Sequence, residues 1–341
     1  MNRREIVTGI SAAAACFVVP TSTRAMVLRE HNAKDYIKGA GALQANDTQP
    51  RPPFIEHRVP REDHYLYARE YQGKGPTFVL LHGYPDNLHI YDLLIPVLVA
   101  AGRHVVAFDF LGFGASEKPA GFNYGFKQQL GDLGAVVDFL KLESLVPVAH
   151  DAGGVAAINF TLSRPKSIAG LVLLNTFYAD APTLRIPELI ELFSLPQTRA
   201  FGLAMASDPK QLAFLLRFQQ LQFEIGVSQA QINVIDNLVQ PLIFNNFAQQ
   251  PSAGPAFAAL AADLRPQVAS NNQQVGRLTE LGIPTTIVWG KSDAYLNVGV
   301  AQDLAGHFKG ASVHLLDAGH WPQLDLPKEV GEYLLAERYL S

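Results

Sequence analysis

Cysteine is almost absent from this 341-residue chain, in which Cys16 is the only one. A single cysteine excludes an intramolecular disulfide framework and a CxxC metal site. Charged residues make up only 17% of the chain, and a net charge of −4 disfavours nucleic acid or an anionic membrane surface as a partner. The 27 glycines and 22 prolines follow no period, which excludes collagen and simple repeats. Because 48% of the residues are apolar, the chain can instead bury a large core.

The first 25 residues have the pattern of an export signal. Arg3 and Arg4 precede an uncharged, mostly apolar stretch at 6–20, and Ala25 offers a small residue where a signal peptidase would cut. The apolar stretch is too short to span a bilayer, and the adjacent arginines resemble a twin-arginine signal. We therefore expect residues 1–25 to direct export to the periplasm, with no stable membrane anchor. Lipidation of Cys16 is an alternative that the sequence leaves open.

Strand-like and helix-like segments alternate after an N-terminal arm that we expect at 26–60. Continuous apolar runs, typical of strands buried on both faces, lie at 77–81, 104–108, 145–149, 171–174, 285–289 and 312–316. Their alternation with helix-like patterns predicts an α/β fold with a mostly parallel central sheet flanked by helices. Residues 178–282 lack such a run and predict a helical cap inserted between core strands. The core would then comprise residues 61–177 and 283–341.

The turn after the strand expected at 145–149 carries a candidate nucleophile. Asp151 stands there in the run His150-Asp151-Ala152-Gly153-Gly154, just before a helix-like pattern. Small flanking residues allow the sharp turn of a nucleophile elbow, and a carboxylate at its centre can attack carbon to form an ester. An aspartate that only caps the following helix is the simpler alternative.

Three other candidates follow strands, at the edge where catalytic groups collect in parallel sheets. His320 follows the last strand and can act as a general base, and Asp293 follows the strand at 285–289 and can fix the histidine tautomer. The backbone N–H groups of Tyr84 and Ala152 can form an oxyanion hole. Each residue alone could be an ordinary turn residue. The chain order of nucleophile, acid and histidine is nevertheless that of the α/β-hydrolase fold.

From about residue 65 onward the chain resembles the α/β-hydrolase superfamily. Residues 109–116, with the sequence DFLGFGAS, are similar to a DxxGxGxS loop of that superfamily. Asp151 in its His-Asp-x-Gly-Gly setting resembles the branch of haloalkane dehalogenases, haloacetate dehalogenases and epoxide hydrolases. The resemblance implies a hydrolase in which Asp151 forms a covalent ester, His320 activates the water that cleaves the ester, and Asp293 orients His320.

The sequence departs from these families where they hold the leaving group. Ala152 occupies the position where the resemblance implies a tryptophan or an arginine, and residues 179–282 contain no tyrosine, tryptophan or histidine. Asn175 and Tyr178 are the candidate contacts for the leaving group. We expect a neutral, hydrophobic small-molecule substrate with water as co-substrate, and neither a cofactor nor a metal.

The favoured reaction is haloalkane dehalogenase-like, because a halide leaves without a proton. One alternative is epoxide hydrolysis through the same aspartyl ester. Others are hydrolysis of an ester or a C–C bond with Asp151 as a base, or a non-catalytic binding protein on this fold.

Overall fold

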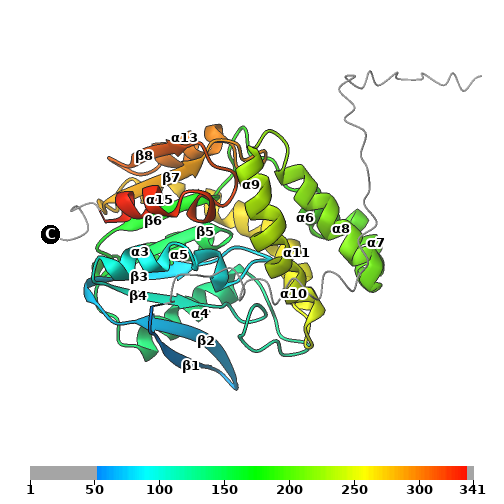
Figure 1. Ribbon diagram of the computed structural model, residues 1–341, viewed down its shortest axis with the longest axis horizontal. Coiled ribbons are helices and arrows are strands. Elements are labelled where there is room, and N and C mark those ends of the chain that lie inside the picture. Colours follow the sequence, from blue (N-terminus) through cyan, green and yellow to red (C-terminus); the bar gives the residue numbers. More distant parts are fainter. Residues whose placement is uncertain (1–51, 336–341) are drawn as a thin grey trace, which may run out of the picture. The chain divides into compact units, whose positions relative to one another are not determined.

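The sheet of this protein accounts for its fold class. The computed structural model describes residues 52–335, so the predicted signal segment and most of the predicted arm lie outside the described residues. The strands are β1 (Ile55–Arg61), β2 (His64–Tyr71), β3 (Lys74–Leu81), β4 (Arg103–Phe108), β5 (Leu145–Asp151), β6 (Leu171–Thr176), β7 (Thr285–Gly290) and β8 (Ser312–Leu316). They form one sheet in the order β1-β2-β4-β3-β5-β6-β7-β8 (Figure 1). All neighbours pair in parallel except β2, which is antiparallel to β1 and β4. The prediction of a mostly parallel sheet is therefore confirmed.

The two ends of the sheet differ from the sequence-based expectation. Residues 55–60, expected in the N-terminal arm, form most of β1, so the sheet begins before residue 61. The strands β1 and β2 mix charged and apolar residues, and a search for continuous apolar runs misses such strands. The prediction that β8 is buried on both faces is wrong. Val313 and Leu315 are 37% and 40% exposed because β8 lies at the edge of the sheet.

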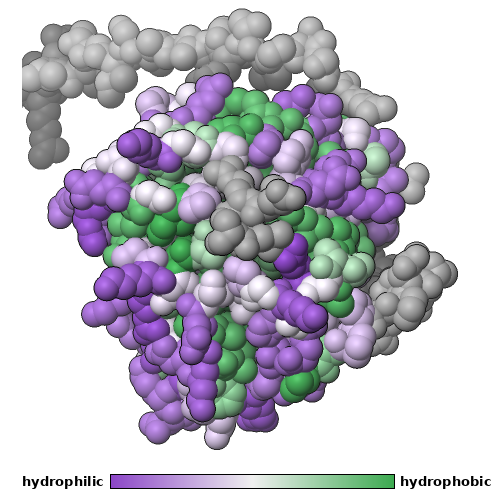
Figure 2. Space-filling view, turned by 90° about the vertical axis from the view of Figure 1, so that its left-hand side faces the viewer, coloured by the Kyte–Doolittle hydropathy of each residue, from purple (hydrophilic) through white to green (hydrophobic). Residues whose placement is uncertain are grey.

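Helices cover both faces of the sheet (Figure 1). The helices of the core are η1 (Leu88–Tyr91), α3 (Ile95–Ala100), α4 (Phe126–Phe139), α5 (Gly153–Ser163), η2 (Pro165–Ser167), α13 (Val298–Gly306), α14 (Pro322–Asp325) and α15 (Pro327–Leu334). Helix α5 packs on β5, β6 and α4, whereas α3 packs on β4 and on α15. Valines 79, 106, 148, 172 and 288, from the inner strands, are fully buried. Figure 2 shows hydrophilic side chains interleaved with separate apolar areas on the face turned away from the cap.

The predicted cap range, 178–282, contains helices and no strands. It contains α6 (Glu188–Ser194), α7 (Pro196–Ala206), α8 (Pro209–Phe223), α9 (Gln229–Val234), the π-helical segment η3 (Ile235–Val239), α10 (Gln240–Ala248), α11 (Gly254–Asn272) and α12 (Val275–Leu278). Helices α6 to α10 lie beside the sheet, at the right of Figure 1. The helix that begins at Gln229 is not regular to Ala248, because η3 separates α9 from α10 just before Pro241. Proline has no N–H to donate and its ring crowds the preceding turn, which favours a local widening of the helix.

Candidate active site

Asp151 occupies the sharp turn between β5 and α5. Its backbone has a φ of 48°, in the left-handed region that non-glycine residues rarely adopt. Neighbouring glycines make room for this turn. A Cβ added at Gly153 would lie 2.6 Å from the carbonyl oxygen of His82, and one added at Gly154 would lie 1.9 Å from Oγ1 of Thr176. The small residues after Asp151 are therefore required by packing, as expected of a nucleophile elbow.

The Asp151 carboxylate is held on one side and open on the other. Its Oδ1 accepts a hydrogen bond from the backbone N–H of Tyr84 at 3.2 Å, and the N–H of Ala152 also bonds to the carboxylate. Its Oδ2 lies 3.9 Å from Nε2 of His320, too far for a direct hydrogen bond. Burial raises the pKa of Asp151, although the charge of His320 and the two backbone N–H groups oppose this rise. The two N–H groups expected to form an oxyanion hole thus both bond to the carboxylate of Asp151.

His320 and Asp293 form a tight pair behind this carboxylate. Nδ1 of His320 lies 2.6 Å from Oδ2 of Asp293, and the two side chains are 7% and 0% exposed. Burial would lower the pKa of His320, but the charge of Asp293 and the hydrogen bond to it outweigh burial and raise the pKa to about 8. Burial would raise the pKa of Asp293, but the charge and hydrogen bond of His320 lower it. The pair therefore keeps a proton on Nδ1 and turns Nε2 toward Asp151.

The structure does not support Asn175 and Tyr178 as contacts for a leaving group. Asn175 is fully buried, and its Nδ2 donates to Oδ2 of Asp293 at 3.0 Å, so it supports the acid instead. The Tyr178 hydroxyl donates to Oδ1 of Asn159 at 3.0 Å, away from the cavity described next. Both residues lie at the end of β6 or just after it, but their polar groups are bonded to other protein residues.

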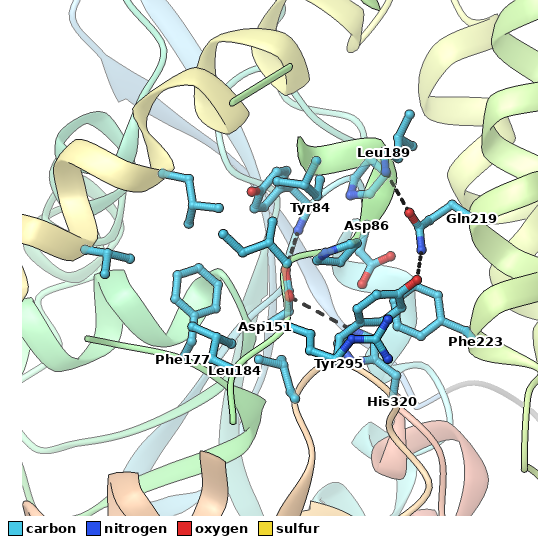
Figure 3. Close-up of a pocket in the computed structure, with 18 of the residues that line it drawn as sticks. Tyr84, Asp86, Asp151, Phe177, Leu184, Leu189, Gln219, Phe223, Tyr295 and His320 are labelled. Carbon is cyan, nitrogen blue, oxygen red and sulfur yellow. Dashed lines mark hydrogen bonds and ion pairs between the residues drawn. The ribbon is translucent and has the colours of Figure 1, made fainter. Parts of the chain in front are cut away.

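A cavity of about 280 Å³ opens above the Asp151 carboxylate. The core contributes Tyr84, Asp86, Asp151, Tyr295, His320 and Trp321, and apolar cap residues that line it include Leu184, Ile186, Leu189, Ile190, Leu216, Phe223, Ile243 and Leu264. Figure 3 shows Asp151 near the centre, with Tyr84 above it and a dashed line toward His320, and with Gln219 and Phe223 of the cap on the same side as His320. The ring of Phe223 lies 4.8 Å from the His320 ring, centroid to centroid. The cavity is therefore mostly apolar. Its charged lining residues are Asp86, Asp151 and His320 of the core together with Asp180, Arg185 and Arg265 of the cap.

Asp86 is a cavity residue that the sequence analysis did not assign to the site. Its Oδ2 accepts the indole N–H of Trp321 at 3.1 Å, and its Oδ1 has no hydrogen-bond partner among residues 52–335. Burial raises the pKa of Asp86 to about 7, against the hydrogen bond from Trp321 and with the charge of Asp151. The sequence feature that could have identified Asp86 is its position just after the turn that follows β3. Gln219 and Gln220, also missed, carry no such signal, because only the docking of α8 brings them to the cavity.

A metal site and a membrane-spanning helix are both absent from the described part of the chain. No group of three or more histidine, cysteine, aspartate or glutamate side chains between residues 52 and 335 has the arrangement of a metal site. Over the same residues, no helix combines the length and the apolar character needed to cross a membrane.

The fold, the elbow and the histidine–aspartate pair together define an enzyme of the α/β-hydrolase class. A family model described as alpha/beta hydrolase fold matches residues 76–327, and the chain belongs to this family.

The chain is similar to curated members with different reactions. Haloalkane dehalogenase 2 of Mycobacterium tuberculosis is 30% identical over 273 residues, 79% of this chain and 89% of that protein. The cis-3-alkyl-4-alkyloxetan-2-one decarboxylase of Shewanella oneidensis is 26% identical over 294 residues, 82% of this chain and 86% of that protein. Epoxide hydrolase 3 of Xenopus tropicalis is 24% identical over 280 residues, 79% of this chain and 73% of that protein. These relatives support a hydrolase of this fold, and their names do not agree on a substrate.

Proposed function

We propose that this enzyme hydrolyses a neutral, hydrophobic substrate through a covalent ester on Asp151, in the manner of a haloalkane dehalogenase. The observation that carries the proposal is the state of the Asp151 carboxylate. One oxygen is fixed by the backbone N–H of Tyr84, while the other has no direct hydrogen bond to His320 and lies at the floor of an apolar cavity. A carboxylate oriented in this way is suited to attack carbon.

In the first step, Oδ2 of Asp151 attacks an sp³ carbon of the substrate. The new C–O bond forms as the carbon–halogen bond breaks, and the halide leaves with the bonding electron pair. No proton is needed for this departure. Among the described residues, the indole N–H of Trp289 is bonded to the Leu296 carbonyl and that of Trp321 to Asp86, while the Tyr295 hydroxyl donates to Glu188. These three donors are already bonded within the protein, which favours a leaving group that requires no proton.

In the second step, His320 takes a proton from water at Nε2, and the resulting hydroxide adds to the Asp151 carbonyl carbon. The oxyanion that forms is stabilised by the N–H groups of Tyr84 and Ala152. Collapse of this intermediate expels the alkoxide, which takes the proton from His320 and leaves as the alcohol. Esterification removes the negative charge of Asp151, one of the causes that raise the pKa of His320. The loss of that charge favours release of the proton from Nε2, so the histidine is available as a base once the ester has formed.

Epoxide hydrolysis is the second candidate, and Asp86 is the observation that favours it. An epoxide oxygen needs a proton donor when the ring opens. Asp86 lines the cavity, has an unpartnered Oδ1 among the described residues, and has a pKa raised to about 7 by burial. Its neutral form could supply that proton. The relatives named haloalkane dehalogenase and epoxide hydrolase are compatible with either reaction.

The test is to trap the ester in the His320→Gln variant. Glutamine cannot act as the base, so the ester should accumulate while attack by Asp151 continues. The variant is incubated separately with pooled bromoalkanes and pooled epoxides, and its intact mass and peptide map are recorded. We expect one adduct per chain on the peptide that contains Asp151, formed with bromoalkanes. An adduct from epoxides alone would select the second candidate.

The control is the double variant Asp151→Asn, His320→Gln, which should form no adduct. If neither pool labels His320→Gln while the unmodified enzyme hydrolyses carboxylic esters, the covalent mechanism is wrong and Asp151 acts as a base.

A further inference from the structure

Two adjacent glutamines of α8 lie in the cavity wall and differ in their hydrogen bonding. Gln219 and Gln220 are 7% and 4% exposed. Oε1 of Gln219 accepts the backbone N–H of Leu189 at 2.8 Å, and its Nε2 donates to the Tyr295 hydroxyl at 2.9 Å (Figure 3). Oε1 of Gln220 has no hydrogen-bond partner within the described range 52–335. The first amide is satisfied by the protein, and the second is not.

A buried amide oxygen without a partner destabilises the folded state. Among residues 52–335 Gln129 and Gln323 also have one, but of the three glutamines only Gln220 lines the cavity. Leu216 and Phe223 lie about one helical turn from Gln220 along α8 and line the same cavity. An apolar side chain at position 220 would continue this wall without leaving a polar group unpaired. The amide is therefore best explained by a hydrogen-bonding group of a ligand, since a few placed polar groups orient ligands in apolar cavities.

We infer that Gln220 binds a hydroxyl group of the substrate, so that the substrate is an otherwise apolar alcohol. This inference rests on the proposed function in taking the cavity as the substrate site. The unpartnered atom is an acceptor, so the ligand must supply a donor. A hydroxyl supplies both a donor for Oε1 and an acceptor for Nε2. A halogen or a carboxylate has no hydrogen to donate to Oε1.

Gln220 lies close along α8 to the residue that contacts His320. Phe223 lies against His320 and three residues after Gln220, which corresponds to a rise of roughly 5 Å along α8. A chain of a few carbon atoms can span that separation. Bromoalkanols of about this length are therefore suitable probes.

The kinetic test compares 6-bromohexan-1-ol with 1-bromohexane in the full-length enzyme, in Gln220→Leu and in Gln219→Leu. The measured quantity is the ratio of kcat/KM for the alcohol to that for the plain bromoalkane. We expect this ratio to fall about tenfold in Gln220→Leu, the effect of one neutral hydrogen bond. Gln219→Leu is the matched control and should retain the ratio, whatever happens to its absolute rates. A ratio that is equal in the unmodified enzyme and Gln220→Leu would overturn the inference.

A binding test does not depend on the proposed chemistry. The Kd values of 1-hexanol and toluene are measured by quenching of tryptophan fluorescence, because Trp321 lines the cavity. Toluene reports the effect of changed shape alone. An increase in the Kd of 1-hexanol that is about tenfold larger than the increase in the Kd of toluene in Gln220→Leu would support the hydroxyl site. Equal changes for the two ligands would refute it. If no bromoalkane or epoxide is turned over but 1-hexanol shows this loss, the proposed reaction fails and the hydroxyl site stands.

Discussion

Replacing Asp293 with asparagine probes how the three candidate catalytic residues depend on one another. Oδ2 of Asp293 accepts hydrogen bonds from Nδ1 of His320 at 2.6 Å and Nδ2 of Asn175 at 3.0 Å. Oδ1 accepts the backbone N–H groups of Tyr295 at 2.9 Å and Leu296 at 3.0 Å. All four partners act as donors, so the NH₂ group of an asparagine meets donors on either side.

The two orientations of the substituted amide in Asp293→Asn have different costs. With its NH₂ toward His320, the amide donates to Nδ1 and moves the ring proton to Nε2, the atom that must accept a proton from water. With its NH₂ turned away, the buried N–H groups of Tyr295 and Leu296 lose their acceptor, which costs about 1–3 kcal/mol for each. The variant also lacks the charge that raises the pKa of His320 to about 8. In serine proteases the equivalent change lowers turnover by about 10⁴ through the wrong tautomer, and we expect a loss of roughly 10³–10⁴ in ester hydrolysis.

Attack on carbon should be less affected, because the backbone N–H of Tyr84 still orients Asp151. The expected result is one rapid equivalent of halide followed by very slow turnover, with an ester visible by intact mass. Rapid-quench measurement of halide release would follow both phases. Asp317→Asn is the control, since Asp317 is an exposed aspartate that pairs with Lys291 at the surface. The reasoning fails if the Asp293→Asn ester is hydrolysed at the rate of the unmodified enzyme.

Two further predictions concern the surroundings of the nucleophile. A Cβ at Gly83 would lie 2.4 Å from Cβ of Asp151, so Gly83→Ala should displace the carboxylate and lower kcat at least about tenfold, whereas Gly276→Ala, with open space around it, should not. Equal rates for the two variants would contradict this reasoning. Folding raises the pKa of Asp86 to about 7, so its contribution to stability is fully present below about pH 4 and is lost as the pH rises to about 7. In chemical denaturation, the free energy of unfolding of Asp86→Asn should rise by up to about 4 kcal/mol relative to that of the unmodified protein as the pH goes from about 4 to 8. A difference in unfolding free energy that stays constant across that range would refute the raised pKa of Asp86.

The sequence determined the fold class and the main candidate residues because both depend on local patterns. Continuous apolar runs predicted β3 to β7 to within a few residues, since strands inside a parallel sheet are buried on both faces. The nucleophile elbow was readable because a turn as sharp as that of Asp151 tolerates only small neighbours. The chain order of Asp151, Asp293 and His320 linked three turns that had little meaning separately.

Tertiary packing decided the rest of the cavity. Asn175 lies at the end of a strand, as a ligand-binding residue would, yet its side chain supports Asp293, because the direction of such a side chain depends on what packs against it. Gln219 and Gln220 are neighbours of the same type, and only the docking of α8 gives one a full set of partners and leaves the carbonyl oxygen of the other without a donor. Asp86 acquires its raised pKa from burial beneath the cap and beside Asp151. Such properties arise from contacts between segments far apart in the chain, which no local sequence pattern records.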